Sequence, residues 1–115
     1  MSKFIYGIPI GGNGQLGLKV EDITGTEVAL TFANNVEYRC ADLITSLSII
    51  DFEAGPQNIM EEWSIIFTTG DSISVDYPDT VHWALAEPVW EANKTYWLSF
   101  IPFNDKYLGI WTVMA

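Results

Sequence analysis

Apolar and polar residues alternate at period two through most of the second half of this chain. The clearest run is the segment 73–77, in which Ile73, Val75 and Tyr77 alternate with serine and aspartate. Successive side chains of a β-strand point to opposite faces of its sheet, so this pattern is typical of a strand with one solvated face. The stretch 61–111 also contains all five tryptophans. We therefore expect it to supply the apolar core of an all-β domain.

Turn-forming residues divide the chain into short segments. Gly70 ends the segment 62–70, Glu87-Pro88 breaks any regular element there, and Asn104-Asp105 predicts a hairpin turn between the last two segments. Such signals recur about every 8 to 12 residues without sustained helical periodicity, as in a sandwich or barrel. We expect one domain over residues 1–115, folded as an antiparallel two-sheet sandwich or a flattened, jelly-roll-like barrel. Its core should contain Trp63, Ile65, Phe67, Val75, Trp83, Tyr96, Leu98 and Phe100.

The first half of the chain gives further strand signals. Residues 4–10 alternate but include a proline, which has no backbone N–H to donate, so a strand here fits a sheet edge best. Segments 27–32 and 36–40 lie on either side of Asn34-Asn35 and are expected to form a hairpin, because asparagine tolerates positive φ. The segment 43–52 is rich in β-branched residues and predicts a separate strand.

The charge balance excludes several classes of partner. Five basic residues stand against fifteen acidic ones, which gives a net charge of −10, and the basic residues are scattered singly. Binding to nucleic acid requires clustered Lys and Arg that displace counterions from phosphates. We therefore expect no nucleic-acid partner. No stretch approaches the roughly 20 apolar residues of a membrane-spanning helix, so we also expect no membrane insertion.

The residues that most often carry chemistry are sparse. His82 is the only histidine and Cys40 the only cysteine, so one chain cannot build a His/Cys metal cluster, and no Gly-x-Ser-x-Gly motif is present. Cys40 is in phase with Val36 and Tyr38, which predicts a small buried thiol. The aspartates at 71, 76 and 79 could offer oxygen ligands to calcium but lack EF-hand spacing. We expect no catalytic residues, no metal and no cofactor.

Tryptophans are the strongest candidates for a contact site, because indole rings stack on sugars and anchor protein interfaces. Trp97 is out of phase with Tyr96 and Leu98, and Trp90 lies in the segment around Pro88. Trp111 alternates with the apolar residues of the last segment. We expect Tyr96, Leu98, Phe100, Leu108 and Ile110 on one face of the final hairpin and Trp97, Ile101, Trp111 and Val113 on the other. The second face would be covered by the chain's own loops or by another subunit.

Several short motifs resemble a small β module of bacteriophage tail and other virion structural proteins. The resemblance runs through Glu62-Trp63-x-Ile65-x-Phe67-Thr68-Thr69-Gly70, Tyr77-Pro78, Val81-x-Trp83, Glu87-Pro88 and Asn93-Lys94-x-Tyr96-x-Leu98-Ser99-Phe100. A hairpin and closing strand follow at 106–111, and Tyr38, Leu43 and Ser46-Leu47 match the upstream part of that module. The match covers about two thirds of the chain, and the first 30 residues lie outside it.

The resemblance implies a non-enzymatic virion component, such as a module of a tail, baseplate or fibre or a decoration protein. It would be synthesised in the cytoplasm of the host bacterium and function in the virion. Repeated copies are usual in such particles, so we expect a homo-oligomer or contacts with other virion proteins. Interface or glycan-binding candidates are Trp90, Trp97 and Trp111. The alternative is a carbohydrate-binding module that recognises a host-surface glycan.

Overall fold

The computed structural model describes residues 4–5, 8–9, 19–54 and 61–114, and these residues form an all-β structure without a helix. The strands are β1 (Phe4–Ile5), β2 (Ile8–Pro9), β3 (Lys19–Ile23), β4 (Glu27–Phe32), β5 (Val36–Phe52), β6 (Trp63–Asp76), β7 (Val81–Trp83), β8 (Thr95–Phe103) and β9 (Lys106–Met114). β3 to β9 form one mixed seven-stranded sheet in the order β3-β5-β6-β8-β9-β7, with β4 also beside β5. The edge strand expected over 4–10 is instead two short strands, β1 and β2, which pair with each other.

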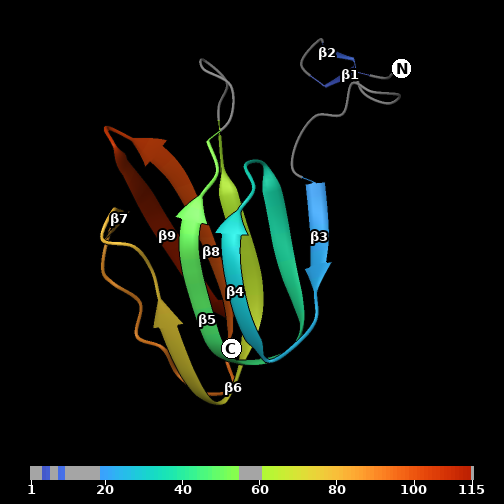
Figure 1. Cartoon of the computed structure of the whole chain (residues 1–115), viewed down its shortest axis with the longest axis vertical. Coiled ribbons are helices and arrows are strands. Elements are labelled where there is room, and N and C mark those ends of the chain that lie inside the picture. Colours follow the sequence, from blue (N-terminus) through green and yellow to red (C-terminus); the bar gives the residue numbers. More distant parts are fainter. Residues whose placement is uncertain (1–3, 6–7, 10–18, 55–60, 115) are drawn as a thin grey trace.

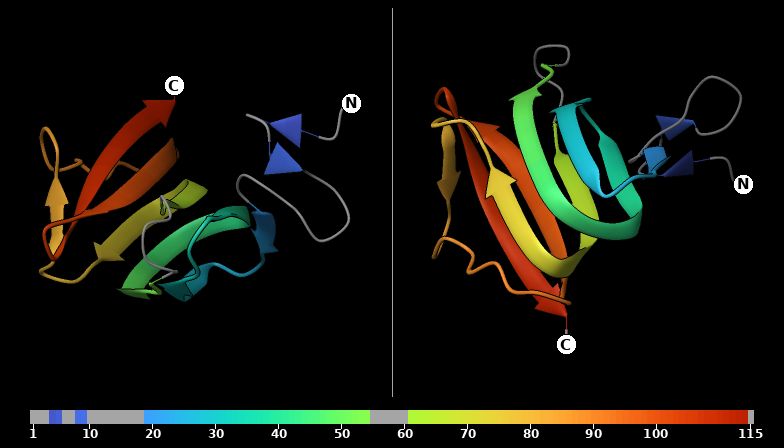
Figure 2. Two further views of the ribbon diagram at one scale, coloured as in Figure 1. Left: turned by 90° about the horizontal axis from the view of Figure 1, so that it is seen from above. Right: turned by 60° about the horizontal axis from the view of Figure 1, so that its bottom comes forward.

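The two longest strands, β5 and β6, bend and double back on themselves (Figure 1). β3 pairs with the first half of β5 and β4 with its second half. β6 follows the same course, since Val36 lies opposite Trp63 and Leu47 lies opposite Val75. The chain therefore makes three U-shaped turns that stack side by side in parallel (Figure 2).

The core lies between the two arms of these U-shaped turns. Phe32 of β4 and Phe52 at the end of β5 place their rings 6.1 and 5.1 Å from the ring of Phe100 on β8. The first arms of β5 and β6, together with β8 and β9, thus face the second arms across the core. Of the predicted core residues, six are buried and Val75 and Trp83 are partly buried against them; the six are Trp63, Ile65, Phe67, Tyr96, Leu98 and Phe100.

The antiparallel prediction is wrong for most of the sheet. Four of the six strand pairings in the large sheet are parallel. The predicted turn at Asn34-Asn35 is confirmed, with Asn35 at φ 59°, but the hairpin is not. The backbone N–H of Asn35 donates to the carbonyl of Glu62, and the N–H of Lys19 donates to the carbonyl of Asn35. The turn therefore carries the chain from one U-shaped turn to the next and does not reverse it within a hairpin.

Gly70 was expected to end a strand, but it lies within β6, where the strand bends. β6 continues through this glycine to Asp76, and the segments 36–40 and 43–52 likewise join into β5. A Cβ atom at Gly70 would lie 3.2 Å from Cγ2 of Thr45, which is closer than ordinary van der Waals contact. Glycine thus allows the bends of the neighbouring strands β5 and β6 to stack.

Candidate functional site

The outer face of β6, β8 and β9, which points away from the core, carries most of the exposed apolar surface of this wall. Across β8 and β9, Trp97 lies opposite Thr112, Ser99 opposite Ile110, and Ile101 opposite Leu108. The exposed fractions are 43% for Trp97, 41% for Ile101 and 59% for Ile110. We call the surface formed by Trp97, Ile101, Leu108 and Ile110 the outer apolar face. Its members come together because β8 and β9 are joined by a two-residue turn.

A chain of hydrogen bonds fixes the indole of Trp97 on this face. Its Nε1–H donates to Oγ of Ser64 at 2.9 Å, and that hydroxyl donates to Oε1 of Glu37 at 3.3 Å. The other oxygen of Glu37 accepts from the guanidinium of Arg39, with Nη2 at 2.7 Å. Glu37 is only 8% exposed. The indole is therefore held by a satisfied, largely buried polar network while much of its surface stays open to solvent, as suits a preorganised contact residue.

Trp111 and Val113 lie on the opposite side of the hairpin from the position expected. The register places Trp111 opposite Leu98 and Val113 opposite Tyr96, so both share the core-facing side. The turn residues Asn104 and Asp105 have φ of 49° and 65°, as a two-residue type I′ turn requires. Because the turn contains two residues, each even-numbered residue of β8 lies opposite an odd-numbered residue of β9. The odd-numbered residues of β9 therefore face the core and the even-numbered ones face outward, the reverse of what was expected.

Trp90 and Trp111 both contribute to packing. The ring of Trp90 lies 5.0 Å from that of Tyr96 and 6.1 Å from that of Phe67. Trp111 is partly buried, and its Nε1–H donates to the carbonyl of Ala86 at 2.8 Å. Of the three predicted contact residues, only Trp97 belongs to the outer apolar face.

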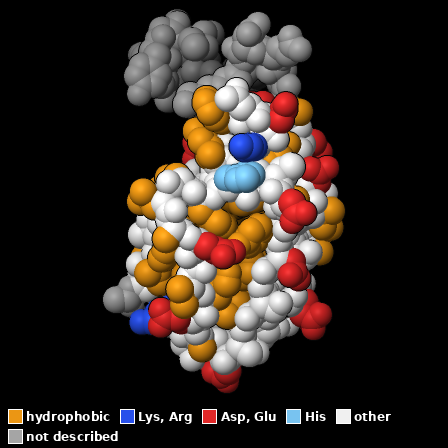
Figure 3. All heavy atoms as spheres, turned by 90° about the vertical axis from the view of Figure 1, so that its left-hand side faces the viewer, with side chains coloured by type: hydrophobic (Ala, Val, Ile, Leu, Met, Phe, Trp, Pro, Cys, Tyr) orange, Lys and Arg blue, Asp and Glu red, His pale blue; other side chains and the backbone are white. Residues whose placement is uncertain are grey.

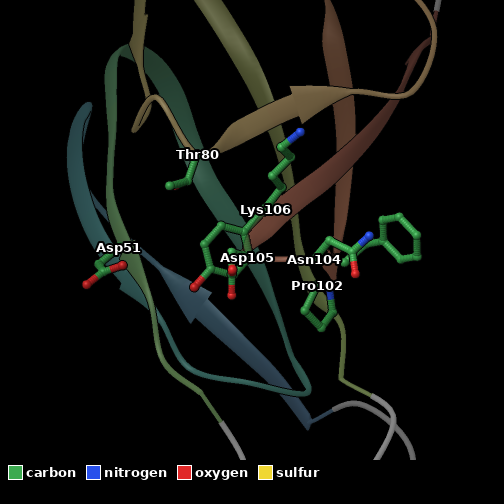
Figure 4. Close-up of a pocket in the computed structure, with 8 residues that line it drawn as sticks. Asp51, Thr80, Pro102, Asn104, Asp105 and Lys106 are labelled. Atoms are coloured by element: carbon green, nitrogen blue, oxygen red, sulfur yellow. The ribbon is translucent and has the colours of Figure 1, made fainter.

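A second candidate site is a pocket at the turn that joins β8 and β9 (Figure 4). It encloses about 490 Å³. The hairpin supplies two aromatic rings, Phe103 and Tyr107, and Asp51 at the end of β5 and Thr80 before β7 complete the opposite side. The full lining is Asp51, Thr80, Pro102, Phe103, Asn104, Asp105, Lys106 and Tyr107. Donors, acceptors and apolar rings therefore converge on one concave surface. We call it the hairpin pocket.

Packing fixes one ring of the hairpin pocket. Tyr107 stacks on Phe52 with centroids 4.2 Å apart, and it meets Trp63 edge-on at 5.3 Å. Partial burial, with the nearby charges of Asp51 and Glu61, raises the pKa of the Tyr107 phenol. The hydroxyl thus remains a neutral hydrogen-bonding group at physiological pH. Sequence reasoning located the turn but missed this pocket, because Asp51 and Thr80 reach it only through the folded chain.

The candidate catalytic side chains lie apart. His82 is exposed on β7, whereas Cys40, which was expected to be buried, is half-buried on β5, and β6, β8 and β9 separate their strands in the sheet. Burial, with a smaller effect from Asp42, raises the pKa of the Cys40 thiol from 9.0 to about 11. In the part of the chain that the structure describes, no three His, Cys, Asp or Glu side chains gather as metal ligands. Among the described residues, no helix is long and apolar enough to cross a membrane.

Comparisons with protein-family models, with curated proteins and with solved structures find no match to this chain.

Proposed function

We propose that this protein is a non-enzymatic structural component of a bacteriophage virion that acts through assembly contacts. The observation that carries the proposal is the outer apolar face, on which Trp97 is exposed yet held by Ser64. Rigid, exposed aromatic side chains are typical anchors of protein interfaces. The motifs that resemble phage tail modules support placement in a virion, in a tail, baseplate, fibre or decoration layer.

The architecture suits a rigid structural part. We also propose that the fold is best described as the two-sheet sandwich or flattened barrel expected from the sequence. The single sheet folds back on itself, and its two halves face each other across a shared core. The separation of His82 from Cys40 and the raised pKa of that thiol support a role without catalysis. A direct check is mass spectrometry of purified phage particles, in which the protein should appear in stoichiometric amounts.

The self-association test uses a matched pair of charge substitutions. Ile101→Asp introduces a carboxylate into the outer apolar face, and Ile50→Asp introduces one on the other wall, where isoleucine is more exposed (57% against 41%). Light scattering at high salt should show assembly by the wild-type chain and by Ile50→Asp. Ile101→Asp should weaken it, because a buried unpaired charge is costly. Equal assembly by both variants, or a wild-type monomer at high concentration, would contradict this contact surface.

A second candidate function is recognition of a host-surface glycan, and the hairpin pocket favours it. Sugars stack on aromatic rings and donate hydroxyl protons to carboxylates, and Phe103, Asp51 and Asp105 offer both kinds of contact there. Glycan-array binding that is lost in Phe103→Ala and retained in Ile50→Ala would support this function. Binding that instead depends on Trp97 would move the glycan site to the outer apolar face. No binding on a broad array would reject glycan recognition.

A further inference from the structure

Among the residues that the structure describes, the outer edge of β9 has no partner strand over residues 110–114. β7 pairs with β9 only at Tyr107 to Gly109, through the register Val81 to Tyr107 and Trp83 to Gly109. The N–H of Tyr107 donates to Thr80 and the carbonyl of Gly109 accepts from Ala84, so odd-numbered residues direct their backbone groups to this edge. By the same alternation, Trp111 and Val113 present theirs outward, where no described backbone group bonds to them.

This edge lacks the charges that the edge strands β3 and β4 carry. Native proteins discourage strand addition by placing charged side chains on edge strands. β3 carries Lys19, Glu21 and Asp22, and β4 carries Glu27. Residues 110–114 are Ile, Trp, Thr, Val and Met, without any charge, in a chain of net charge −10. From the side of the molecule that carries β7, hydrophobic side chains gather over the middle of the surface, with acidic ones around them (Figure 3).

A small apolar pocket lies next to the same edge. It encloses about 250 Å³ and is lined by Leu85, Ala86, Gly109, Ile110 and Trp111. Leu85 is 94% exposed, which leaves an aliphatic side chain without cover beside an open strand. If a further strand were added to this edge, its residue opposite Ile110 would lie next to this pocket. A flexible apolar side chain on that residue would fill the pocket.

We propose that a second copy of this chain pairs with β9 by antiparallel strand addition, in a symmetric dimer centred on Thr112. In this register Trp111 of one copy pairs with Val113 of the other. The N–H and C=O groups of both residues then form hydrogen bonds with the second copy, and the two-fold axis repeats the same bonds in the other direction. Ile110 lies opposite Met114 of the second copy, and that methionine enters the apolar pocket. This inference deepens the proposed assembly function, because it identifies the partner and the contact, and it involves only Ile110 of the outer apolar face.

The first test removes one backbone donor. The N–H of Val113 points away from β8, so Val113→Pro leaves the ladder with β8 intact while it blocks pairing at the edge. Val113→Ala is the control, since it shortens the same side chain and keeps the N–H. In analytical ultracentrifugation the wild-type chain and Val113→Ala should dimerise. Val113→Pro, which loses two equivalent hydrogen bonds in the dimer, should raise the dissociation constant by about 10- to 100-fold. Equal dissociation constants for both variants would overturn the proposal.

The second test traps the predicted two-fold axis. Facing residues of a non-hydrogen-bonded antiparallel pair have Cα atoms about 4.5 Å apart, within the range that a disulfide spans. In a Cys40→Ser background, Thr112→Cys should form a reducible covalent dimer on mild oxidation, and Ile50→Cys should not. Cross-linking no greater than that of Ile50→Cys would overturn the edge dimer. If Ile101→Cys cross-links instead, the edge dimer fails while assembly through the outer apolar face stands; a wild-type monomer would reject both.

Discussion

At the scale of single residues, Gly109 lies where β9 passes against the indole of Trp83. A Cβ atom at this position would lie 2.7 Å from two ring carbons of Trp83 and 3.0 Å from Phe100. Gly109→Ala should therefore force the indole to shift and destabilise the fold by about 1–3 kcal/mol, as overpacked cores do. Urea denaturation measures the change. The control is Gly70→Ala, whose added atom has one contact tighter than ordinary van der Waals distance, with the end of a threonine side chain at 3.2 Å, and should cost less. A larger loss for Gly70→Ala would contradict this packing.

Cys40 gives a prediction that depends on pH. With its pKa raised from 9.0 to about 11, mainly by burial, the thiol stays protonated at pH 8. Alkylation by iodoacetamide should then be about 100-fold slower in the folded protein than in urea, since only the thiolate reacts. A group whose folded pKa is raised stabilises the fold below its unfolded pKa, so this contribution should be lost between pH 9 and 11. Labelling of folded protein at the unfolded rate at pH 8 would contradict the burial of Cys40.

At the scale of elements, the irregular segment 84–94 depends on one buried threonine of β6. Oγ of Thr69 donates to the carbonyl of Glu91 at 2.6 Å and accepts from the N–H of Lys94 at 2.9 Å. Thr69→Val should leave these backbone groups without partners and cost about 1–3 kcal/mol of unfolding free energy. Thr68→Val is the matched control, because Thr68 bonds to Thr95 in a partly exposed position. Equal losses in both variants would show that segment 84–94 does not depend on Thr69.

At the scale of the whole molecule, negative charge opposes the folded state. Fifteen acidic residues face five basic ones, and two ion pairs, Lys19–Glu21 and Arg39–Glu37, are formed among the described residues. Raising the salt concentration from about 0.01 to 0.15 M shortens the screening length from about 30 to about 8 Å. The urea midpoint should rise over this range, because self-repulsion destabilises a compact chain of high net charge. Asp76 and Asp79 are exposed, and the double substitution Asp76→Asn and Asp79→Asn should make the urea midpoint less dependent on salt. A urea midpoint that falls as salt is added would contradict the role of self-repulsion.

The sequence alone determined the class of fold, because strand formation and turn chemistry are local. Period-two alternation identified strand structure around Trp63 and Ile73, which belong to one strand, and around Tyr96, and six of the eight predicted core residues are buried. The asparagine-containing turns at 34–35 and 104–105 are present because this residue type tolerates positive φ. Alternation around Trp97 also placed its ring on the face of the final hairpin opposite Tyr96 and Leu98.

Only the tertiary structure decided how these strands pair. Alternation shows which side chains share a face but not which strand lies alongside or in which direction, so the parallel stacking of β3-β4, β5 and β6 had no sequence signal. The candidate sites followed from that pairing. Trp97 meets Ser64, 33 residues away, and Asp51 meets the hairpin turn because U-shaped strands return their ends to the same region. Local interactions thus fixed the elements, whereas burial of the shared core fixed their order and direction.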